Sequence, residues 1–177
     1  MNHYIETERF ILREILPIDA ERMFELDSDP EVHQYLGNKP VTSIHEINDA
    51  IVFIRQQYID NGIGRWAIID KETNNFVGWC GLKFVDYEIN NHKNYYDLGY
   101  RLIKKYWGKG IATETAIASL KYAFKQLKIN EVYAIADCEN IGSNKILKNL
   151  GFKLIEVFIY EGIPHNWYKI EKGDFME

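Results

Sequence analysis

The stretch Tyr106-Trp107-Gly108-Lys109-Gly110-Ile111-Ala112-Thr113 decides the fold of this chain. It follows an expected strand, residues 95–103, and opens the longest amphipathic helix, residues 111–128. Apolar side chains recur along this helix at about 3.6 residues. They are Ala112, Ala116, Leu120, Ala123 and Leu127. A glycine-rich turn between a strand and such a helix indicates a binding site at the start of the helix.

The first amides of a helix lack intrahelical partners and lie at the positive end of the helix dipole. Gly108 and Gly110 carry no side chain that would hold an anion away from these amides, so the turn can receive a phosphate or pyrophosphate. Residues 98–113 also contain four basic residues and no acid: Arg101, Lys104, Lys105 and Lys109. In the alternative interpretation the glycines only form a turn and the lysines only face solvent.

Two other phosphate motifs fit the turn less well. A P-loop has four residues between its first glycine and the Gly-Lys pair, whereas one residue separates Gly108 from Gly110. A dinucleotide fingerprint has glycine or alanine where Thr113 stands, and it normally opens a parallel sheet near the start of a domain. Asp137 follows the next expected strand and can imitate the ribose-binding acid, so a dinucleotide-binding oxidoreductase remains an alternative.

Composition excludes several classes of protein. The 177 residues contain 21 Lys and Arg against 26 Asp and Glu, a net charge of −5 that argues against a nucleic-acid binder but permits an amine partner. The five histidines are scattered, so we expect no metal site. Cys80 and Cys138 are expected to be buried, reduced thiols. No apolar run is long enough for a membrane span, and residues 1–13 do not resemble a signal peptide, so we expect a cytoplasmic protein.

One domain is expected over residues 1–177, because the chain contains no repeat, low-complexity tract or linker. The pattern predicts strands at 7–15, 65–70, 76–85, 95–103, 132–137, 153–160 and 165–170, and helices at 20–26, 29–36, 44–61, 111–128 and 142–150. This order indicates a mixed sheet flanked by helices, an α+β or α/β fold. The sequence does not indicate an oligomeric state.

Several blocks resemble one enzyme family. They are the turn Lys105–Gly110, Thr7–Arg13, Gly78–Leu82, Leu98-Gly99-Tyr100, Asn140-x-x-Ser143 and Leu150-Gly151-Phe152. In this order and spacing they resemble the GNAT superfamily of acetyl-CoA-dependent N-acetyltransferases, in the branch that contains ribosomal-protein alanine N-acetyltransferases. The family turn is Gln/Arg-x-x-Gly-x-Gly/Ala, so Lys105 is a departure that keeps the charge.

The resemblance implies a mostly antiparallel sheet in which two neighbouring strands, 95–103 and 132–137, splay apart to admit the pantetheine of acetyl-CoA. The pyrophosphate would lie on the amides of residues 108–112, and amides near Leu102 and Ile103 would bind the thioester oxygen. The expected cofactor-binding residues are Leu102, Ile103, Lys105, Trp107, Gly108, Lys109, Gly110, Ile111, Ala112, Thr113, Asn140 and Lys145. Asn140 can equally be a helix cap, and Lys145 can equally be a solvated lysine.

For catalysis the resemblance points to Asp97 and Ser143. Asp97 is a candidate general base for the amine, provided that burial raises its pKa; it can instead be a surface acid at a strand end. A loop acid, Asp86 or Glu88, or a chain of waters can replace it. Many family members protonate the thiolate with a tyrosine, but that position is Leu147 here. Ser143 can serve instead, unless it only caps its helix.

The predicted activity is transfer of an acetyl group to a primary amine by direct attack in a ternary complex, so positioning should dominate catalysis. The acceptor can be a protein N-terminus or a small molecule, and Tyr35, Trp79, Tyr95 and Tyr160 are candidates to line its tunnel. Each of these aromatic residues can equally belong to the core. A CoA-binding sensor without catalysis is the alternative from another class.

Overall fold

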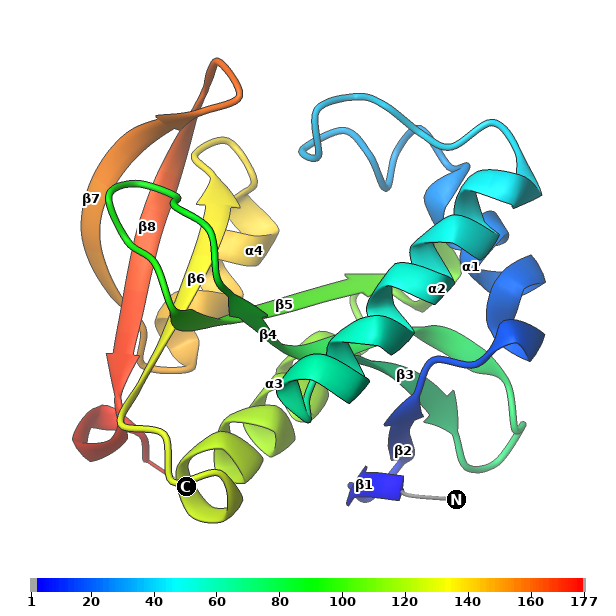
Figure 1. The fold of residues 1–177 in the computed structure, drawn as a ribbon, viewed down its shortest axis with the longest axis horizontal. Helices are drawn as coiled ribbons and strands as arrows, with labels where there is room; N and C mark the ends of the chain where they lie inside the picture. The colour runs from blue at the N-terminus through cyan, green and yellow to red at the C-terminus, as the bar shows by residue number, and fades with distance from the viewer. Residues whose placement is uncertain (1–2, 177) are drawn as a thin grey trace.

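The computed structural model describes residues 3–176, so residues 1, 2 and 177 of the expected domain lie outside it. One eight-stranded sheet, in the order β1-β2-β3-β4-β5-β6-β8-β7, carries helices on both faces (Figure 1). Its strands are β1 (His3–Glu6), β2 (Phe10–Glu14), β3 (Arg65–Asp70), β4 (Phe76–Val85), β5 (Tyr95–Leu102), β6 (Glu131–Asp137), β7 (Lys153–Tyr160) and β8 (Ile163–Glu171). The helices are α1 (Ala20–Asp27), α2 (Ile44–Asn61), α3 (Ile111–Lys121) and α4 (Ile141–Asn149).

Every pair of neighbouring strands is antiparallel except β5 and β6, which are parallel. The mixed, mostly antiparallel sheet that the sequence predicted is confirmed. A dinucleotide-binding domain is built on a parallel sheet, so the oxidoreductase alternative is wrong. The strand that leads into the glycine-rich turn is β5, in the middle of the sheet.

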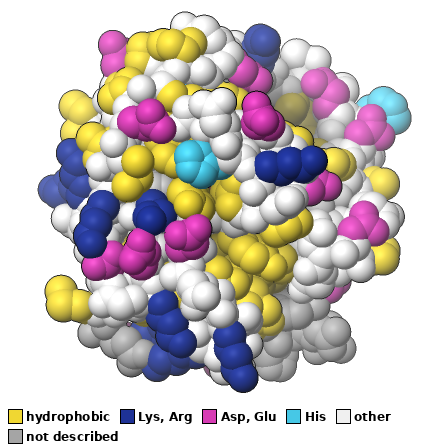
Figure 2. Space-filling model, turned by 60° about the vertical axis from the view of Figure 1, so that its left-hand side comes forward, with side chains coloured by type: hydrophobic (Ala, Val, Ile, Leu, Met, Phe, Trp, Pro, Cys, Tyr) yellow, Lys and Arg dark blue, Asp and Glu magenta, His cyan; other side chains and the backbone are white. Residues whose placement is uncertain are grey.

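Two apolar layers hold the helices on the sheet. Residues of α1 and α2, such as Met23 and Ile51, pack with Ala67 and Ile69 of β3 on one face. Residues of α3 and α4 pack with β4, β5 and β6 on the other face. No helix among residues 3–176 is long and apolar enough to cross a membrane. On the face that Figure 2 shows, acidic and basic side chains are interspersed around hydrophobic ones.

Several local predictions are wrong. Residues 30–38 form turns rather than the expected helix, because the amides of Gln34 and Leu36 donate to carbonyls three residues back instead of four. The chain then reverses at Gly37 and Asn38, which adopt left-handed conformations (φ 81° and 52°). The segment is therefore a loop that joins α1 to α2. The strand expected at 7–15 is β2 alone, preceded by the unexpected β1.

Two further expectations needed correction. The long helix leaves α-helical geometry after Lys121 and continues as a short π-helical segment, Tyr122–Gln126. Cys80 is buried as predicted, but Cys138 is only half-buried, because it lies in the turn just beyond the end of β6.

Candidate active site

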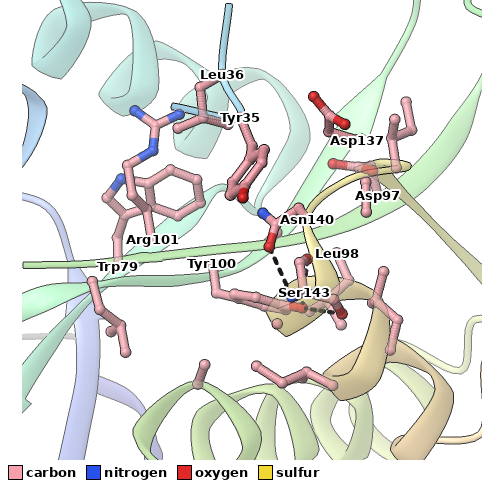
Figure 3. A pocket seen from close by; sticks show the side chains of 18 of the residues that line it. Tyr35, Leu36, Trp79, Asp97, Leu98, Tyr100, Arg101, Asp137, Asn140 and Ser143 are labelled. Atoms are coloured by element: carbon pink, nitrogen blue, oxygen red, sulfur yellow. Dashed lines mark hydrogen bonds between the residues drawn. The ribbon is translucent and has the colours of Figure 1, made fainter. Parts of the chain in front are cut away.

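A cavity of about 810 Å³ opens where β5 and β6 separate (Figure 3). The two strands pair only at Asp97 and Tyr133, and beyond that point residues 98–102 and 135–137 form facing walls of the cavity. The prediction that these strands splay apart is confirmed. The volume falls in the range of pockets that hold a cofactor or a drug-sized ligand, about 300–1,000 Å³.

The glycine-rich turn forms one end of this cavity. Gly108 and Gly110 have φ of 71° and 74°, a region that glycine adopts without strain. α2 and α4 begin with a side chain that accepts an amide hydrogen bond, but α3 begins at Gly110 without any side-chain cap. Within residues 3–176, and apart from Gly108 and its two chain neighbours, no heavy atom lies within 4 Å of the place that a Cβ of Gly108 would occupy. The first amides of α3 are therefore free to bind an anion.

Most of the basic residues around the turn form ion pairs within the protein. Three of the four form ion pairs with acids of residues 25–31, so their charges are used within the protein. The pairs and their N···O distances are Arg101–Asp27 (2.5 Å), Lys104–Glu31 (2.6 Å) and Lys105–Glu25 (2.9 Å). The backbone amides of the turn, rather than this cluster, are what the structure offers to an anion.

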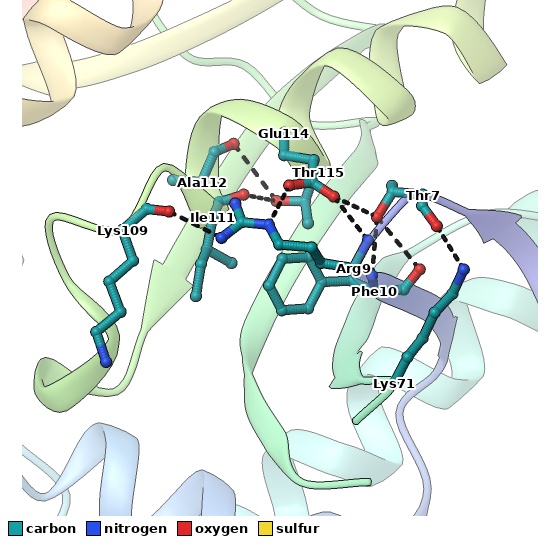
Figure 4. A network of polar contacts seen from close by, with 9 residues as sticks. All are labelled: Thr7, Arg9, Phe10, Lys71, Lys109, Ile111, Ala112, Glu114 and Thr115. Carbon is teal, nitrogen blue, oxygen red and sulfur yellow. Dashed lines mark hydrogen bonds and ion pairs between the residues drawn. The ribbon is translucent and has the colours of Figure 1, made fainter. Parts of the chain in front are cut away.

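Arg9, to which the sequence analysis gave no role, contacts the turn from outside the cavity (Figure 4). Its Nη1 donates to the Lys109 carbonyl at 3.1 Å, and its Nε lies 2.7 Å from Glu114 of α3. Burial alone would raise the pKa of Glu114, but hydrogen bonds from Thr7 and Arg9 hold it below its usual value. The resemblance at Thr7–Arg13 was the available signal for this link between the segment before β2 and the phosphate turn.

The start of α4 brings a hydroxyl into the cavity. Asn140 is the N-cap of α4, since its Oδ1 accepts the Ser143 amide at 3.0 Å, so Ser143 is not the cap. The Ser143 hydroxyl instead hydrogen-bonds the Tyr100 hydroxyl at 3.0 Å (Figure 3). Tyr100 comes from β5, and the sequence predicted no role for it. Burial raises the pKa of Tyr100 above its usual value, so the phenol keeps its proton at neutral pH.

Asp97 lies within β5 and its side chain is only 15% exposed, so it is no surface acid. Its carboxylate forms an ion pair with the Arg65 guanidinium, which also donates to the Asp97 carbonyl at 2.6 Å. Burial raises the pKa of Asp97, and the Arg65 charge partly offsets that rise. The carboxyl group is therefore held in one orientation at the cavity wall.

The cavity wall includes most of the predicted site. Its predicted members are Asp97, Leu102, Trp107, Gly108, Gly110, Ile111, Ala112, Thr113, Asn140 and Ser143, together with the aromatic residues Tyr35, Trp79, Tyr95 and Tyr160. Trp107 also donates its indole N–H to the Leu102 carbonyl at 2.9 Å, which fixes the turn against β5.

Four predicted cofactor-binding residues lie outside this wall: Ile103, Lys105, Lys109 and Lys145. The Ile103 amide donates to the Val77 carbonyl at 3.1 Å, so it is committed to the sheet and is not available to an oxyanion. Lys145 lies on the outer side of α4 beside Cys138, so it does not point into the cavity.

Comparisons with known proteins identify the family. The sequence matches the family described as "Acetyltransferase (GNAT) domain" over residues 9–153. "Uncharacterized N-acetyltransferase p20" of Bacillus licheniformis is 35% identical over 147 residues, which cover 83% of this chain and 80% of that protein.

Solved structures share the fold over nearly the whole chain. An acetyltransferase of the GNAT family from Bacillus anthracis has a TM-score of 0.78 and 25% identity, covering 96% of this chain and 98% of that one. The ribosomal-protein-S5-alanine acetyltransferase of Vibrio fischeri has a TM-score of 0.77 and 18% identity, with both chains fully covered. Spermidine N-acetyltransferase of Vibrio cholerae, solved with CoA and spermine, has a TM-score of 0.76 and 20% identity, covering 95% of this chain and 98% of that one.

Proposed function

This chain belongs to the GNAT family of N-acetyltransferases, and we propose that it transfers an acetyl group from acetyl-CoA to a primary amine by direct attack in a ternary complex. The observation that carries the proposal is the uncapped start of α3, which opens into the same cavity as Asp97 and the Ser143–Tyr100 pair. An anion site, a candidate base and a candidate acid thus share one cavity.

The cavity fits acetyl-CoA, which supplies the thioester and the leaving thiol when bound. The amides that begin α3, around residues 110–113, would hold the pyrophosphate. The splayed backbone of β5 would pair with the pantetheine, and the Asn140 amide nitrogen can donate to it while Oδ1 serves the cap. The Leu102 amide is the remaining candidate donor to the thioester oxygen, because Ile103 is occupied.

Asp97 and Ser143 would divide the proton transfers between them. Asp97 would accept the proton of the amine, since a desolvated carboxyl group is a stronger base than an exposed one. Ser143 would donate a hydrogen bond or a proton toward the departing sulfur. Tyr100 would hold the Ser143 hydroxyl in place at 3.0 Å. The remaining rate enhancement comes from positioning the two reactants.

Release of free thiol from acetyl-CoA, measured with a panel of primary amines, tests this function. We expect amine-dependent release, and an at least tenfold weaker affinity for CoA in Gly108→Asp, on the order of 1.4 kcal/mol, because the new carboxylate occupies the phosphate site. Gly62→Asp is the matched control: Gly62 has a φ of 67°, equally open surroundings and a place at the end of α2, outside the cavity wall.

The outcomes of these measurements distinguish an enzyme from a CoA-binding sensor and test the assignment of the turn. Unchanged CoA affinity in Gly108→Asp would contradict the assignment of the turn. Saturable binding of CoA without thiol release on any amine would favour a sensor over an enzyme. Equal losses of affinity in the two variants would show that backbone strain, rather than the phosphate site, causes the effect.

A further inference from the structure

The cavity floor on the side of α1 and α2 is formed by facing residues of β4 and β5. Trp79 faces Arg101, Gly81 faces Gly99, and Lys83 faces Asp97. Residues that face each other across two antiparallel strands project from the same face of the sheet. These pairs therefore form one row, and each member except Gly81 lines the cavity.

The two facing glycines leave room for the side chain of Arg65, which comes from β3. A Cβ on Gly99 would lie 2.8 Å from the Arg65 Cζ atom, so any other residue there would push the guanidinium out of its place. Arg65 also donates to the Gly81 carbonyl at 2.5 Å, and its side chain is only 13% exposed. A fixed and largely covered cation thus lies at the centre of the floor.

Trp79 lies between two guanidinium groups. Its ring centre is 5.5 Å from Arg65 Cζ and 5.1 Å from Arg101 Cζ, distances at which a cation and an aromatic face attract each other. The floor therefore carries its aromatic surface and its positive charge side by side. Tyr35 and Tyr95 add further aromatic surface to the walls.

The charges of the floor do not cancel. Asp97 is paired with Arg65, and Asp27 is paired with Arg101. Lys83 is the third cation. Among residues 3–176 it forms no ion pair within 4 Å, although its charge also lowers the pKa of Asp97, and its ammonium donates to the Tyr87 hydroxyl at 2.8 Å. Three cations against two carboxylates leave a net charge of +1 at the floor.

The other carboxylates of the cavity do not change this balance at the floor. Glu31 belongs to the loop after α1 and is paired with Lys104. Asp137 stands at the end of β6 and accepts the Glu139 amide at 2.8 Å. Asp137 forms no ion pair among residues 3–176, but it belongs to β6 and not to the row of facing residues on β4 and β5. At the floor itself, the second ammonium group of a polyamine would meet the ammonium of Lys83.

We propose that the acceptor is an amino acid or a similar small amine that carries a carboxylate next to an aromatic or branched apolar body. The carboxylate of the acceptor binds the Lys83 ammonium and is also attracted by the charge of Arg65. The apolar body packs on Trp79 and the tyrosines, and the amine faces Asp97. This inference rests on the proposed acetyltransferase function and narrows its acceptor. Opposite charges brought together in a partly desolvated site discriminate strongly between ligands.

The test compares acceptors that differ by one group at saturating acetyl-CoA. L-Phenylalanine and phenethylamine differ only in the carboxylate, so we expect kcat/KM to be at least about tenfold higher for phenylalanine. In Lys83→Gln the ratio should fall to within about threefold. Lys93→Gln, which alters an exposed loop lysine outside the cavity wall, should keep the wild-type ratio.

Three results would overturn this inference: equal kcat/KM for phenylalanine and phenethylamine, a higher value for spermidine or an alanyl peptide amide, or an unchanged ratio in Lys83→Gln. In each of these cases an amine is still acetylated, so the proposed function stands and only the acceptor class falls. Absence of thiol release with every amine would overturn the function together with the inference.

Discussion

The hydrogen bond between Tyr100 and Ser143 joins two hydroxyl groups that lie far apart in the sequence. Because Asn140 already caps α4, removal of the Ser143 hydroxyl should leave the helix start intact. We expect Ser143→Ala to lower kcat by about tenfold to a hundredfold, with little change in the affinity for CoA or in the melting temperature. Stopped-flow turnover and calorimetric titration with CoA measure the two quantities separately.

Tyr100→Phe separates positioning from proton transfer. It should lower kcat less than Ser143→Ala, because the serine hydroxyl remains but is no longer held. The raised pKa of Tyr100 keeps the phenol neutral, so the alkaline limb of the wild-type pH profile should not report its titration. If Tyr100→Phe lowered kcat more than Ser143→Ala did, at unchanged stability, the tyrosine rather than the serine would be the general acid.

The direction of the pKa shift at Asp97 predicts how the activity depends on pH. Burial raises this pKa, so the carboxyl group takes up its proton at a higher pH than an exposed aspartic acid does. Activity that needs the carboxylate is lost as pH falls through that raised value. We expect Asp97→Asn to lower kcat/KM and to abolish this acidic limb. Asp86→Asn, in the exposed loop, should keep the limb; loss of the limb there would move the base to Asp86.

At the scale of single residues, motif and spacing predicted those site residues whose position depends only on their neighbours in the sequence. Gly108, Gly110 and Asn140 lie where the pattern placed them, because turn conformation and capping depend on neighbouring residues. Tyr100 and Arg9 could not be assigned, since their roles depend on contacts with Ser143 and Glu114 across the fold. The availability of the Ile103 amide was equally hidden, because it depends on the register of β5 against β4.

At the scale of elements, Arg9 and Glu114 fix the start of α3 to the turn before β2 (Figure 4). We expect Arg9→Gln to weaken CoA affinity by about fivefold, on the order of 1 kcal/mol, through loss of the bond to the Lys109 carbonyl. Calorimetric titration with CoA measures this change.

Lys71→Gln is the control for Arg9, because Lys71 binds the same chain segment, at the Thr7 carbonyl, without touching the phosphate turn. It should leave CoA affinity unchanged. Equal weakening in both variants would mean that the segment before β2 acts as a whole, and that the Arg9 contact with the turn has no separate part.

The end of α1 is tied to β5 by the Asp27–Arg101 pair, in which the Asp27 side chain is 10% exposed and that of Arg101 22%. Removal of one partner leaves an unpaired charge in a desolvated place, so Asp27→Asn should lower the free energy of unfolding by about 3 kcal/mol. Glu31→Gln breaks the exposed pair with Lys104 and should have a far smaller effect. Urea unfolding of both variants measures the two free energies of unfolding. Equal losses of stability in Asp27→Asn and Glu31→Gln would contradict the expectation.

Elements with a continuous pattern were predicted well, and those shaped by tertiary contacts were not. The capping box Ser43–Glu46 and the stop at Gly62 define α2 as expected. Residues 29–36 carry a helix start, yet the chain forms turns there, reverses at Gly37, and brings the Val41 amide to the Asp27 carbonyl. The same loop contributes Tyr35 to the cavity wall, and no local pattern shows either of these tertiary contacts.

At the scale of the whole molecule, the net charge of −5 argued against a nucleic-acid binder but said nothing of where an anion would bind. The basic cluster around residues 98–113 suggested an electrostatic socket for phosphate. The structure pairs most of these cations with acids of α1 and its loop, and leaves backbone amides for the phosphate. Sequence counts charges, but their pairing is decided by the fold.

The central claim is that the cavity between β5 and β6 holds acetyl-CoA with its pyrophosphate on the first amides of α3. A crystal structure of the chain with CoA measures this directly. We predict hydrogen-bond distances between pyrophosphate oxygens and amide nitrogens within residues 108–113, with the pantetheine between β5 and β6 and its sulfur near Ser143. CoA bound elsewhere, or with its pyrophosphate away from these amides, would contradict the account.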